Sequence, residues 1–167
     1  MTTVFTTMES PLGRLLLSGF VDGNGPAALA TVTAPGQKGA RGEPDADWEP
    51  DAAALAPAVE QLAAYFAGEL TVFDLPLAPV GTKFRQRIWA ALDDIPYGGT
   101  VTYGELGAAA GQSPRAVRAV GGAVGANPLL VIRPCHRVMG ANGALTGFAA
   151  GVERKRWLLE LERGTLF

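Results

Sequence analysis

The sequence predicts an α/β domain followed by a mainly helical domain. Residues 3–32 are rich in β-forming residues and are broken by turn signals, whereas apolar residues recur at helix spacing after residue 82. Between the two regions, Leu75–Gly81 contains Pro76 and Pro79, which is the composition of an interdomain linker. The length of 167 residues suits one domain or two small ones, so it is compatible with this division.

The N-terminal region is predicted to contain strands and a single helix. Glu9-Ser10-Pro11 is a turn-like break between the first two strands, and residues 34–51 form a loop rich in Pro, Gly, Asp and Glu. Gly68 fits the C-cap of the helix. The expected elements are strands at Thr3–Met8, Leu12–Ser18 and Ala27–Thr33, a helix at Ala54–Ala67 and a short strand at Thr71–Asp74.

Capping signals and helix periodicity define the C-terminal region. Thr102 and Glu105 have the spacing of a capping box, which starts a short helix that runs to Ala110. Ser113-Pro114 is the start signal of a second helix, with Pro at the first helical position. The other expected elements are a helix at Lys83–Ile95, an extended segment at Leu129–Ile132, a hairpin over Val138–Thr146 that turns at Asn142-Gly143, a loop at Gly147–Gly151 and a final helix at Val152–Glu162.

The overall charge of −2 combines two halves of opposite sign. Residues 1–81 hold three basic and ten acidic side chains, and residues 82–167 hold eleven basic and six acidic side chains. The C-terminal half therefore carries a charge of +5, which fits a phosphate-binding surface. A solvated face with local ion pairs explains the same charge equally well.

Composition limits the compartment and the cofactors. No apolar run approaches the roughly 20 residues that span a bilayer, and the N-terminus lacks the basic and apolar blocks of a signal peptide. A single cysteine fits a reducing compartment, so we expect a cytoplasmic protein without a membrane partner. One Cys and one His are too few soft ligands for a metal site, and no glycine-rich phosphate loop has standard spacing, so neither a metal nor a cofactor is expected.

The only cysteine, Cys135, directly precedes the only histidine, His136. A cysteine attacks as the thiolate, and an imidazole can take the thiol proton directly or through a water. The pair is therefore a candidate nucleophile and base. A buried, inert cysteine beside a hydrogen-bonded histidine is the competing interpretation, because adjacent side chains need not point the same way.

Two short helices joined at Gly111, with Arg115 and Arg118 on the second, have the order of a helix-turn-helix motif. The second helix is rich in Ala and Gly, so its backbone can approach another group closely. Such an approach suits a DNA groove or tight packing against a neighbouring helix, and both interpretations stay open.

Pro134-Cys135-His136-Arg137-Val138 resembles the active-site signature of the O6-alkylguanine-DNA alkyltransferases, also called methylated-DNA–protein-cysteine methyltransferases. The resemblance is specific over about residues 82–163 and looser upstream, where it rests on Tyr65-Phe66-Ala67-Gly68 and the general layout. Further motifs in the family's order are Ile95-Pro96-Tyr97-Gly98, Tyr103-Gly104-Glu105-Leu106, residues 115–121, Gly125-Ala126-Asn127-Pro128 and Trp157-Leu158-Leu159.

The resemblance implies the nature of each domain. Residues 1–75 would form an α/β domain with a ribonuclease H-like sheet, and residues 76–81 would link it to the next domain. Residues 82–167 would form a mainly α catalytic domain with a winged helix-turn-helix-like core that binds DNA.

The resemblance also implies a reaction, the irreversible transfer of an alkyl group from O6 of guanine in DNA to Cys135, so that each molecule acts once. His136 would deprotonate Cys135 through a water, and Glu162 would orient the imidazole. Tyr103 would donate a proton toward N3 of guanine as the purine leaves. Asn127 would brace the turn that follows the recognition helix.

The implied partner is double-stranded DNA, entered from the minor groove with the damaged base flipped out and with little sequence dependence. Arg118 would fill the space of the flipped nucleotide. The implied DNA-contacting residues are Ser113, Arg115, Arg118, Ala119, Gly122 and Tyr103. The implied pocket residues are Cys135, Val138, Phe148 and Ala149, with the carbonyls of Cys135 and Val138 facing the guanine amine and the amide of Ala149 facing O6. A monomer is expected, whereas cooperative DNA binding and activity on O4-alkylthymine stay open.

Three positions depart from the family's pattern. Phe148 stands where many relatives have Tyr, and Ala149 stands where Ser is frequent, so two hydroxyl groups are absent from the pocket. Arg133 stands where an aliphatic residue is usual, and its charge either favours the Cys135 thiolate or points to solvent. Two other functions stay in view: a non-catalytic relative that only binds alkylated bases, and a cysteine hydrolase that turns over.

Overall fold

The computed structural model describes residues 1–23, 25–145 and 147–166, and these form two compact units. The first unit contains Met1–Val80 together with Pro128–Ile132. The second unit contains Gly81–Asn127 and the described residues from Arg133 onward.

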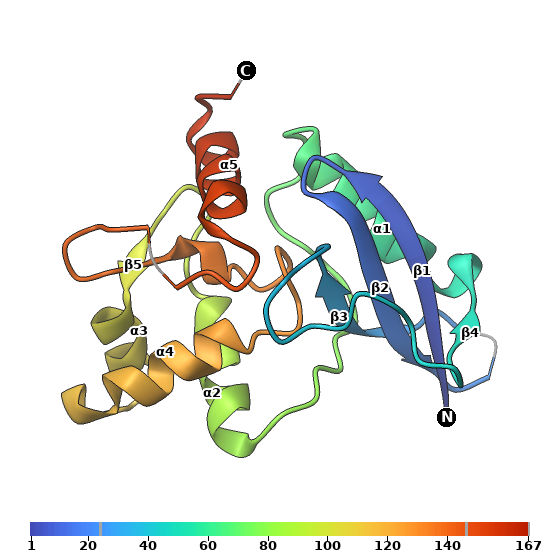
Figure 1. The fold of residues 1–167 in the computed structure, drawn as a ribbon, viewed down its shortest axis with the longest axis horizontal. Coiled ribbons are helices and arrows are strands. Elements are labelled where there is room, and N and C mark those ends of the chain that lie inside the picture. The colour runs from blue at the N-terminus through green and yellow to red at the C-terminus, as the bar shows by residue number, and fades with distance from the viewer. Residues whose placement is uncertain (24, 146, 167) are drawn as a thin grey trace. The chain divides into compact units, whose positions relative to one another are not determined.

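A four-stranded sheet forms the centre of the first unit (Figure 1). Its strands are β1 (Thr2–Ser10), β2 (Gly13–Val21), β3 (Ala28–Thr33) and β4 (Glu49–Pro50), in the order β3-β2-β1-β4. β1 pairs antiparallel with β2 and parallel with β4, and β2 pairs antiparallel with β3. The predicted strands at Thr3–Met8, Leu12–Ser18 and Ala27–Thr33 are thus confirmed, and the predicted loop over residues 34–51 contains only the short β4.

The turn between β1 and β2 is fixed by local chemistry. The Ser10 hydroxyl donates to the Gly13 carbonyl at 2.7 Å and accepts from the Leu12 amide at 3.1 Å. Gly13 has a φ of 104°, which favours glycine because other residues meet a steric penalty there. This short turn sets the register that pairs Thr2 with Val21.

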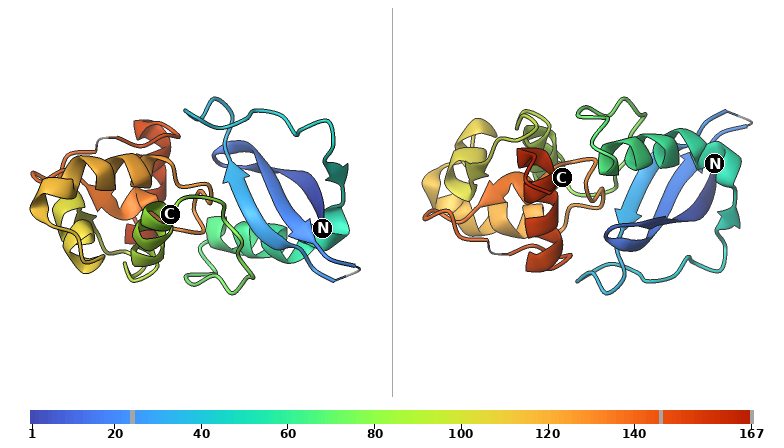
Figure 2. Two further views of the ribbon diagram at one scale, coloured as in Figure 1. Left: turned by 90° about the horizontal axis from the view of Figure 1, so that it is seen from below. Right: turned by 90° about the horizontal axis from the view of Figure 1, so that it is seen from above.

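Helix α1 (Ala52–Phe66) covers one face of the sheet, as both views of Figure 2 show. The Asp51 side chain caps its N-terminus by accepting from the Ala54 amide at 3.0 Å. Ala67 is the C-cap, and the predicted Gly68 follows it with a φ of 77°. The helix buries Leu55, Ala58, Leu62, Tyr65 and Phe66.

The predicted strand at Thr71–Asp74 is wrong. None of these residues is in a strand, and the backbone polar groups of Asp74 are bound by a side chain instead. Gln61 donates to the Asp74 carbonyl and accepts from the Asp74 amide, both at 2.9 Å. The glutamine amide therefore replaces a neighbouring strand at this point.

The edge strand β3 is paired by two segments from later in the sequence. Leu29 exchanges hydrogen bonds of 2.8 Å with Pro76 and Ala78, so part of the predicted 76–81 linker belongs to the first unit. Val32 donates to the Pro128 carbonyl at 2.8 Å and accepts from Leu130 at 3.1 Å. Residues 128–132 therefore belong to the first unit, although the sequence assigned them to the second domain.

The predicted extended segment Leu129–Ile132 is extended only at its beginning. Leu129 forms a β-bridge with Val32, but Val131 has a φ of 72° and Ile132 donates to the Leu130 carbonyl at 2.8 Å. A buried, β-branched residue in this conformation is strained, so the chain turns sharply before it reaches Cys135.

Helices dominate the second unit, as predicted. Thr102 and Glu105 form the predicted capping box, with hydrogen bonds of 3.0 and 3.1 Å between their side chains and amides. The Trp89 indole donates to the Ala123 carbonyl at 2.8 Å and so ties two helices together. The elements are α2 (Lys83–Leu92), β5 (Val101–Thr102), α3 (Tyr103–Ala109), the 3-10 turn η1 (Pro114–Ala116), α4 (Val117–Gly125), the 3-10 turn η2 (Cys135–Arg137), β6 (Val138–Met139) and α5 (Val152–Arg163).

The predicted hairpin over Val138–Thr146 is wrong as a pair of strands. Its Asn142-Gly143 turn does form, since the Gly143 amide donates to the Gly140 carbonyl at 2.8 Å. The only strand there, β6, instead pairs in parallel with β5, and Thr146 lies outside the described residues. The turn signal was local and correct, whereas the partner of the strand came from a distant segment.

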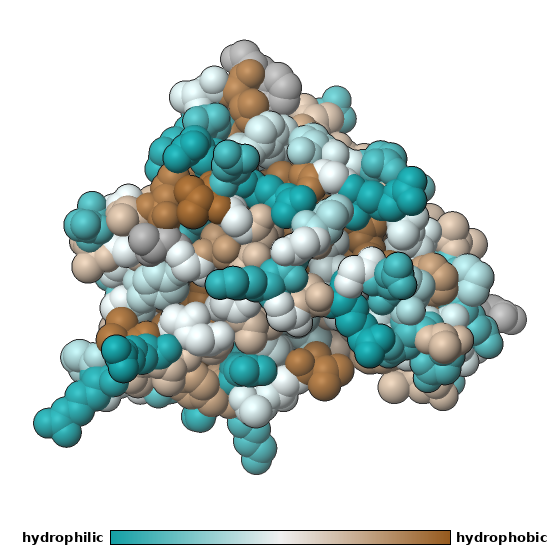
Figure 3. Space-filling view, viewed as in Figure 1, coloured by the Kyte–Doolittle hydropathy of each residue, from teal (hydrophilic) through white to brown (hydrophobic). Residues whose placement is uncertain are grey.

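Apolar residues on the surface lie as separate patches among hydrophilic ones on the face shown in Figure 3. The exposed large hydrophobic residues are Met1, Val72, Val80, Val117 and Val152. Within the described residues, no helix is long and apolar enough to cross a membrane.

Candidate active site

Cys135 begins the short turn η2 and is held by its backbone. The Arg133 carbonyl accepts from the Cys135 amide at 2.8 Å and from the Asn127 side chain at 2.9 Å. Pro134, which lies between Arg133 and Cys135, removes one amide donor and restricts the backbone. Asn127 directly follows the C-cap of α4, so its side chain connects the end of that helix to the turn that carries the thiol.

The Cys135 thiol is buried, and burial raises its pKa to about 11. A hydrogen bond with Asn127 and the charge of Lys155 oppose this shift without cancelling it. At neutral pH the resting residue is therefore a protonated thiol, and it needs a base or a stabilising charge to become a nucleophile.

The buried pair of His136 and Glu162 is the candidate for that base. Nε2 of His136 lies 2.6 Å from Oε2 of Glu162, and both side chains are almost completely buried. Burial lowers the pKa of His136, although Glu162 partly offsets the shift. With the Nε2 proton directed at the carboxylate, Nδ1 keeps its lone pair, and this buried atom has no hydrogen-bond partner among the described residues.

Arg137 completes the buried cluster, and sequence reasoning gave it no role. Its Nε and Nη2 atoms donate to the two oxygens of Glu162 at 2.8 and 3.0 Å, and its Nη1 donates to the Ile95 carbonyl at 2.6 Å. The guanidinium also lies 5.7 Å from the ring centre of Tyr97. A buried carboxylate needs a cation, so the Arg beside His136 in the motif was the available signal.

Lys155 is the second buried charge that sequence reasoning left without a role. Its side chain is fully buried, its Nζ donates to the Val138 carbonyl at 2.5 Å, and it lies 5.8 Å from the ring centre of Phe148. Burial lowers the pKa of Lys155, and the charge of Cys135 opposes that shift. The signal was present on α5, where Lys155 falls at helix spacing with the buried Leu158, Leu159 and Glu162.

Tyr103 lines a cavity of about 350 Å³ together with Val117, Arg118, Gly121 and Gly147. Burial, followed by the charge of Cys135, raises the pKa of Tyr103, so its hydroxyl stays protonated at neutral pH. Gly147 has a φ of 67°, and a Cβ at that position would lie 3.0 Å from the Tyr103 hydroxyl. Glycine therefore lets the loop approach this hydroxyl closely.

The expected DNA-contacting residues of η1 and α4 share one exposed surface. Ser113 precedes η1 as its N-cap residue but makes no capping hydrogen bond with its side chain. On the opposite side of α4, Val120, Ala123 and Val124 are buried in the second unit. The exposed residues are Ser113, Arg115, Arg118, Ala119 and Gly122.

Two of the remaining pocket residues, Val138 and Phe148, lie near Lys155. Val138 is buried, while Phe148 and Ala149 are partly exposed. The Val138 carbonyl, expected to face the guanine amine, already accepts from Lys155 and has one further lone pair for a ligand.

Arg133 follows neither of the two alternatives that its sequence position suggested. Its side chain is only 13% exposed, and Nη2 lies 3.4 Å from Oδ2 of Asp93. Its Nε and Nη1 atoms are buried without a partner in the described part of the chain. The guanidinium is therefore directed at the C-cap of α2 rather than at solvent or the thiol.

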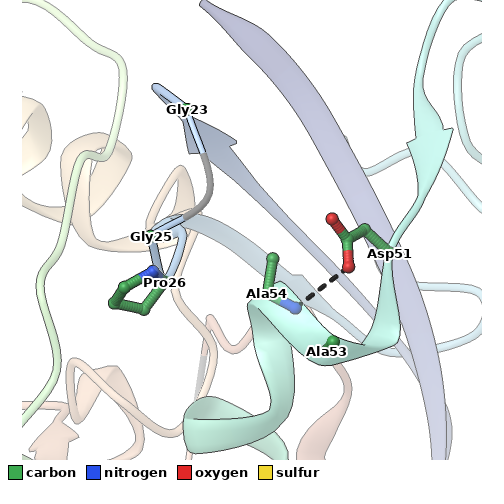
Figure 4. A pocket seen from close by; sticks show the side chains of 6 residues that line it. All are labelled: Gly23, Gly25, Pro26, Asp51, Ala53 and Ala54. Atoms are coloured by element: carbon green, nitrogen blue, oxygen red, sulfur yellow. Dashed lines mark hydrogen bonds between the residues drawn. The ribbon is translucent and has the colours of Figure 1, made fainter.

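A second cavity of about 320 Å³ lies in the first unit and is lined by Gly23, Gly25, Pro26, Asp51, Ala53 and Ala54 (Figure 4). Among the described residues that line it, the one charged side chain is Asp51, which already caps α1. Among the described residues, no group of three His, Cys, Asp or Glu side chains is placed to hold a metal ion.

Two family models match the chain. The model described as 6-O-methylguanine DNA methyltransferase, ribonuclease-like domain, matches residues 3–79, and the model of the DNA binding domain of the same family matches residues 83–164. A methylated-DNA–protein-cysteine methyltransferase of Mycobacterium bovis is 49% identical over 160 residues, covering 95% of this chain and 92% of the relative. A protein of the same name from Methanosarcina acetivorans is 47% identical over 158 residues, covering 95% and 97%.

The fold is also similar to a solved structure, that of Mycobacterium tuberculosis OGT in complex with DNA. The TM-score is 0.84 with 48% identity, and the match covers 96% of this chain and 93% of the other. The predicted fold class, a ribonuclease-like α/β domain and a helical DNA-binding domain, is confirmed. On these matches, the chain belongs to the 6-O-methylguanine DNA methyltransferase family.

Proposed function

We propose that this protein repairs DNA by direct reversal of damage, transferring the alkyl group of O6-alkylguanine irreversibly to Cys135. The observation that carries the proposal is the buried Cys135 beside a His136–Glu162 pair, in the unit that also holds the Tyr103 cavity. Relatives that are 45–49% identical over most of the chain bear the name of this activity.

The first step is removal of the thiol proton. The raised pKa of Cys135 makes a base necessary, and Nδ1 of His136 is the atom left to accept the proton, through an intervening water. Glu162 fixes the tautomer and compensates the imidazolium that forms, while Arg137 keeps the carboxylate in place.

The second step exchanges two bonds at the alkyl carbon. A bond forms between Cys135 Sγ and carbon, and the bond between carbon and O6 of guanine breaks. The purine leaves with the electron pair and takes a proton at N3 from Tyr103, which is available because its raised pKa keeps the hydroxyl protonated. The thioether has no route back to a thiol, so each molecule reacts once.

The substrate reaches this site as a flipped base of double-stranded DNA. The exposed surface of η1 and α4 would contact the backbone from the minor groove, with little sequence dependence. Arg118 stands at the cavity of Tyr103 and would fill the space of the flipped nucleotide. The carbonyls of Cys135 and Val138 and the amide of Ala149 would then hold the guanine edge.

We retain the finer expectations as parts of the proposal. The functional division of the chain is a domain over 1–75, a linker over 76–81 and a catalytic domain over 82–167. The protein acts as a cytoplasmic monomer, without a cofactor. Sedimentation on short and long DNA duplexes tests cooperative binding, and a duplex with O4-methylthymine tests the wider substrate range.

The direct test mixes the protein with excess duplex DNA that contains O6-methylguanine and follows the mass of the intact chain. Transfer predicts a gain of about 14 Da that saturates at one equivalent per protein. The matched Cys135→Ser variant should bind the same DNA without gaining mass. If the unaltered protein binds the DNA without gaining mass, it is a non-catalytic relative. If each protein molecule removes many methyl groups from the DNA, it is a hydrolase.

A further inference from the structure

The first half of α2 carries three exposed cations, Lys83, Arg85 and Arg87. The helix itself contains no acidic residue that could pair with them. Among the described residues, none of these three side chains forms an ion pair or a hydrogen bond. Their charge is therefore available to an anionic partner.

The charges of α2 are the reverse of those that would stabilise the helix. The N-terminus of a helix has a partial positive charge and favours acidic side chains, whereas the C-terminus favours basic ones. In α2 the cations occupy the N-terminal half, and Asp93 and Asp94 follow the last helical residue. Local helix stability therefore does not account for this pattern, which indicates a role for the cations outside the helix.

Arg85 lies on the side of α2 that packs against α4 (Figure 1). Trp89 follows Arg85 by one helical turn, and the Trp89 indole donates to the Ala123 carbonyl of α4 at 2.8 Å. The indole extends back toward the start of α2, since a Cβ at Gly81 would overlap its ring. Ala123 directly follows Gly122, which belongs to the exposed surface of η1 and α4. Arg85 therefore borders that surface.

Arg87 provides a comparison on the same helix. It is two residues from Trp89, so the helical repeat directs it to nearly the opposite side of α2 from α4. Arg85 and Arg87 are matched in residue type, in exposure and in having no partner among the described residues. They differ in the side of the helix, and only Arg85 is on the side of the exposed surface of η1 and α4.

We infer that Arg85 binds a phosphate of the DNA backbone and so extends the DNA interface from η1 and α4 onto the first turn of α2. The inference rests on the proposed function and adds a contact to it. A guanidinium suits this role, because its donors match the oxygens of a phosphate and the contact does not depend on base sequence. Lys83, in the same turn, adds positive charge nearby. Arg85 touches no reacting atom and acts by holding the duplex.

The test measures how binding of a short, undamaged duplex depends on salt. Each phosphate contact releases counterions and adds about 0.9 to the slope of the log association constant against the log salt concentration. Arg85→Gln should therefore reduce the magnitude of this slope by about 1, whereas Arg87→Gln and Arg85→Lys should retain it. Fluorescence anisotropy of a labelled duplex between about 50 and 200 mM salt gives the slope.

The inference is overturned by an unchanged slope in Arg85→Gln, by an equal fall in Arg87→Gln, or by an equal fall in Arg85→Lys, which keeps the charge. Partial unfolding of a variant does not imitate the expected result, because a smaller active fraction lowers the amplitude of binding and not the slope. Failure of the proposed function is a separate result. The unaltered protein would then gain no mass from a duplex with O6-methylguanine, whatever the salt dependence of its variants.

Discussion

The two units differ in what they bury. Among the described residues, the first unit buries Ser18 and Gln37 as its polar side chains, and both are neutral. The second unit buries Asn127, His136, Arg137, Lys155 and Glu162. Buried charge destabilises a fold unless it is compensated, so its concentration in the second unit distinguishes the unit that holds Cys135 from the unit whose buried polar side chains are neutral.

Of the variants considered, Glu162→Gln should have the largest effect, because it removes a buried charge of the second unit. The neutral amide leaves Arg137 uncompensated and no longer fixes the His136 tautomer. We expect a loss of roughly 3–5 kcal/mol in the free energy of unfolding and a transfer rate lower by about 10²–10⁴. Urea denaturation and single-turnover methyl transfer measure the two effects. Glu153→Gln, at an exposed position of the same helix, should change neither, and a Glu162→Gln protein with the normal rate would refute the assignment of the base.

Leu62→Ala tests the first unit, whose buried polar side chains are neutral. Leu62 is fully buried in α1, so the cavity left by its truncation should cost about 2–5 kcal/mol. The transfer rate of the folded molecules should stay the same, because the first unit contributes no charge to the reaction. Denaturation curves give the stability, and single-turnover rates well below the transition give the activity. A proportionate loss of rate in fully folded protein would mean that the first unit also shapes the site.

The pair between Arg133 and Asp93 should respond asymmetrically. Asp93→Asn leaves a mostly buried guanidinium whose Nε and Nη1 atoms have no partner among the described residues, at a cost of about 1–3 kcal/mol. Arg133→Ile leaves only a carboxylate that is 46% exposed and should cost less. Urea denaturation of both variants and of the double variant measures the difference. Equal costs would show that the two side chains act as an ordinary surface ion pair.

The smallest expected effect is a pH dependence of stability that comes from His136. Its pKa in the folded protein lies below the ordinary value of 6.5, so the unfolded chain binds a proton first as the pH falls. The stabilisation is therefore present above pH 6.5 and is lost as the pH falls toward the folded pKa. The slope cannot exceed about 1.4 kcal/mol per pH unit. Denaturation at a series of pH values should show this slope in the unaltered protein but not in His136→Gln, and a slope common to both would assign it to other groups.

Local signals in the sequence predicted much of the fold. The turn at Ser10, the capping box at Thr102 and the apolar spacing of α1 each act within a few residues, and the structure contains all three. The failures involve distant partners. The Thr71–Asp74 strand is replaced by contacts with Gln61, and β6 pairs with β5 instead of folding back on itself. The β-propensity of a segment does not specify which distant segment pairs with it.

The candidate site shows the same contrast between local signals and contacts that only the fold creates. The adjacent Cys135 and His136 were evident from the sequence, and the family resemblance added Glu162. Arg137 and Lys155 were missed because a charged side chain is normally exposed, and only tertiary packing shows that these two are buried. Their positions in the signature motif and on the apolar face of α5 were visible but were not interpreted.

The central claim, that Cys135 attacks the alkyl carbon, is tested most directly by isotopic labels in the substrate. The duplex would carry O6-methylguanine with a heavy oxygen isotope at O6 and a heavy carbon isotope in the methyl group. Attack at carbon predicts that the heavy carbon appears on the Cys135 peptide and that the heavy oxygen stays in the restored guanine. Heavy methanol in solution would mean that water, not Cys135, displaces the alkyl group. Water attacks the methyl carbon if the heavy oxygen stays in guanine and attacks the base if ordinary oxygen replaces it, and either result would contradict the account.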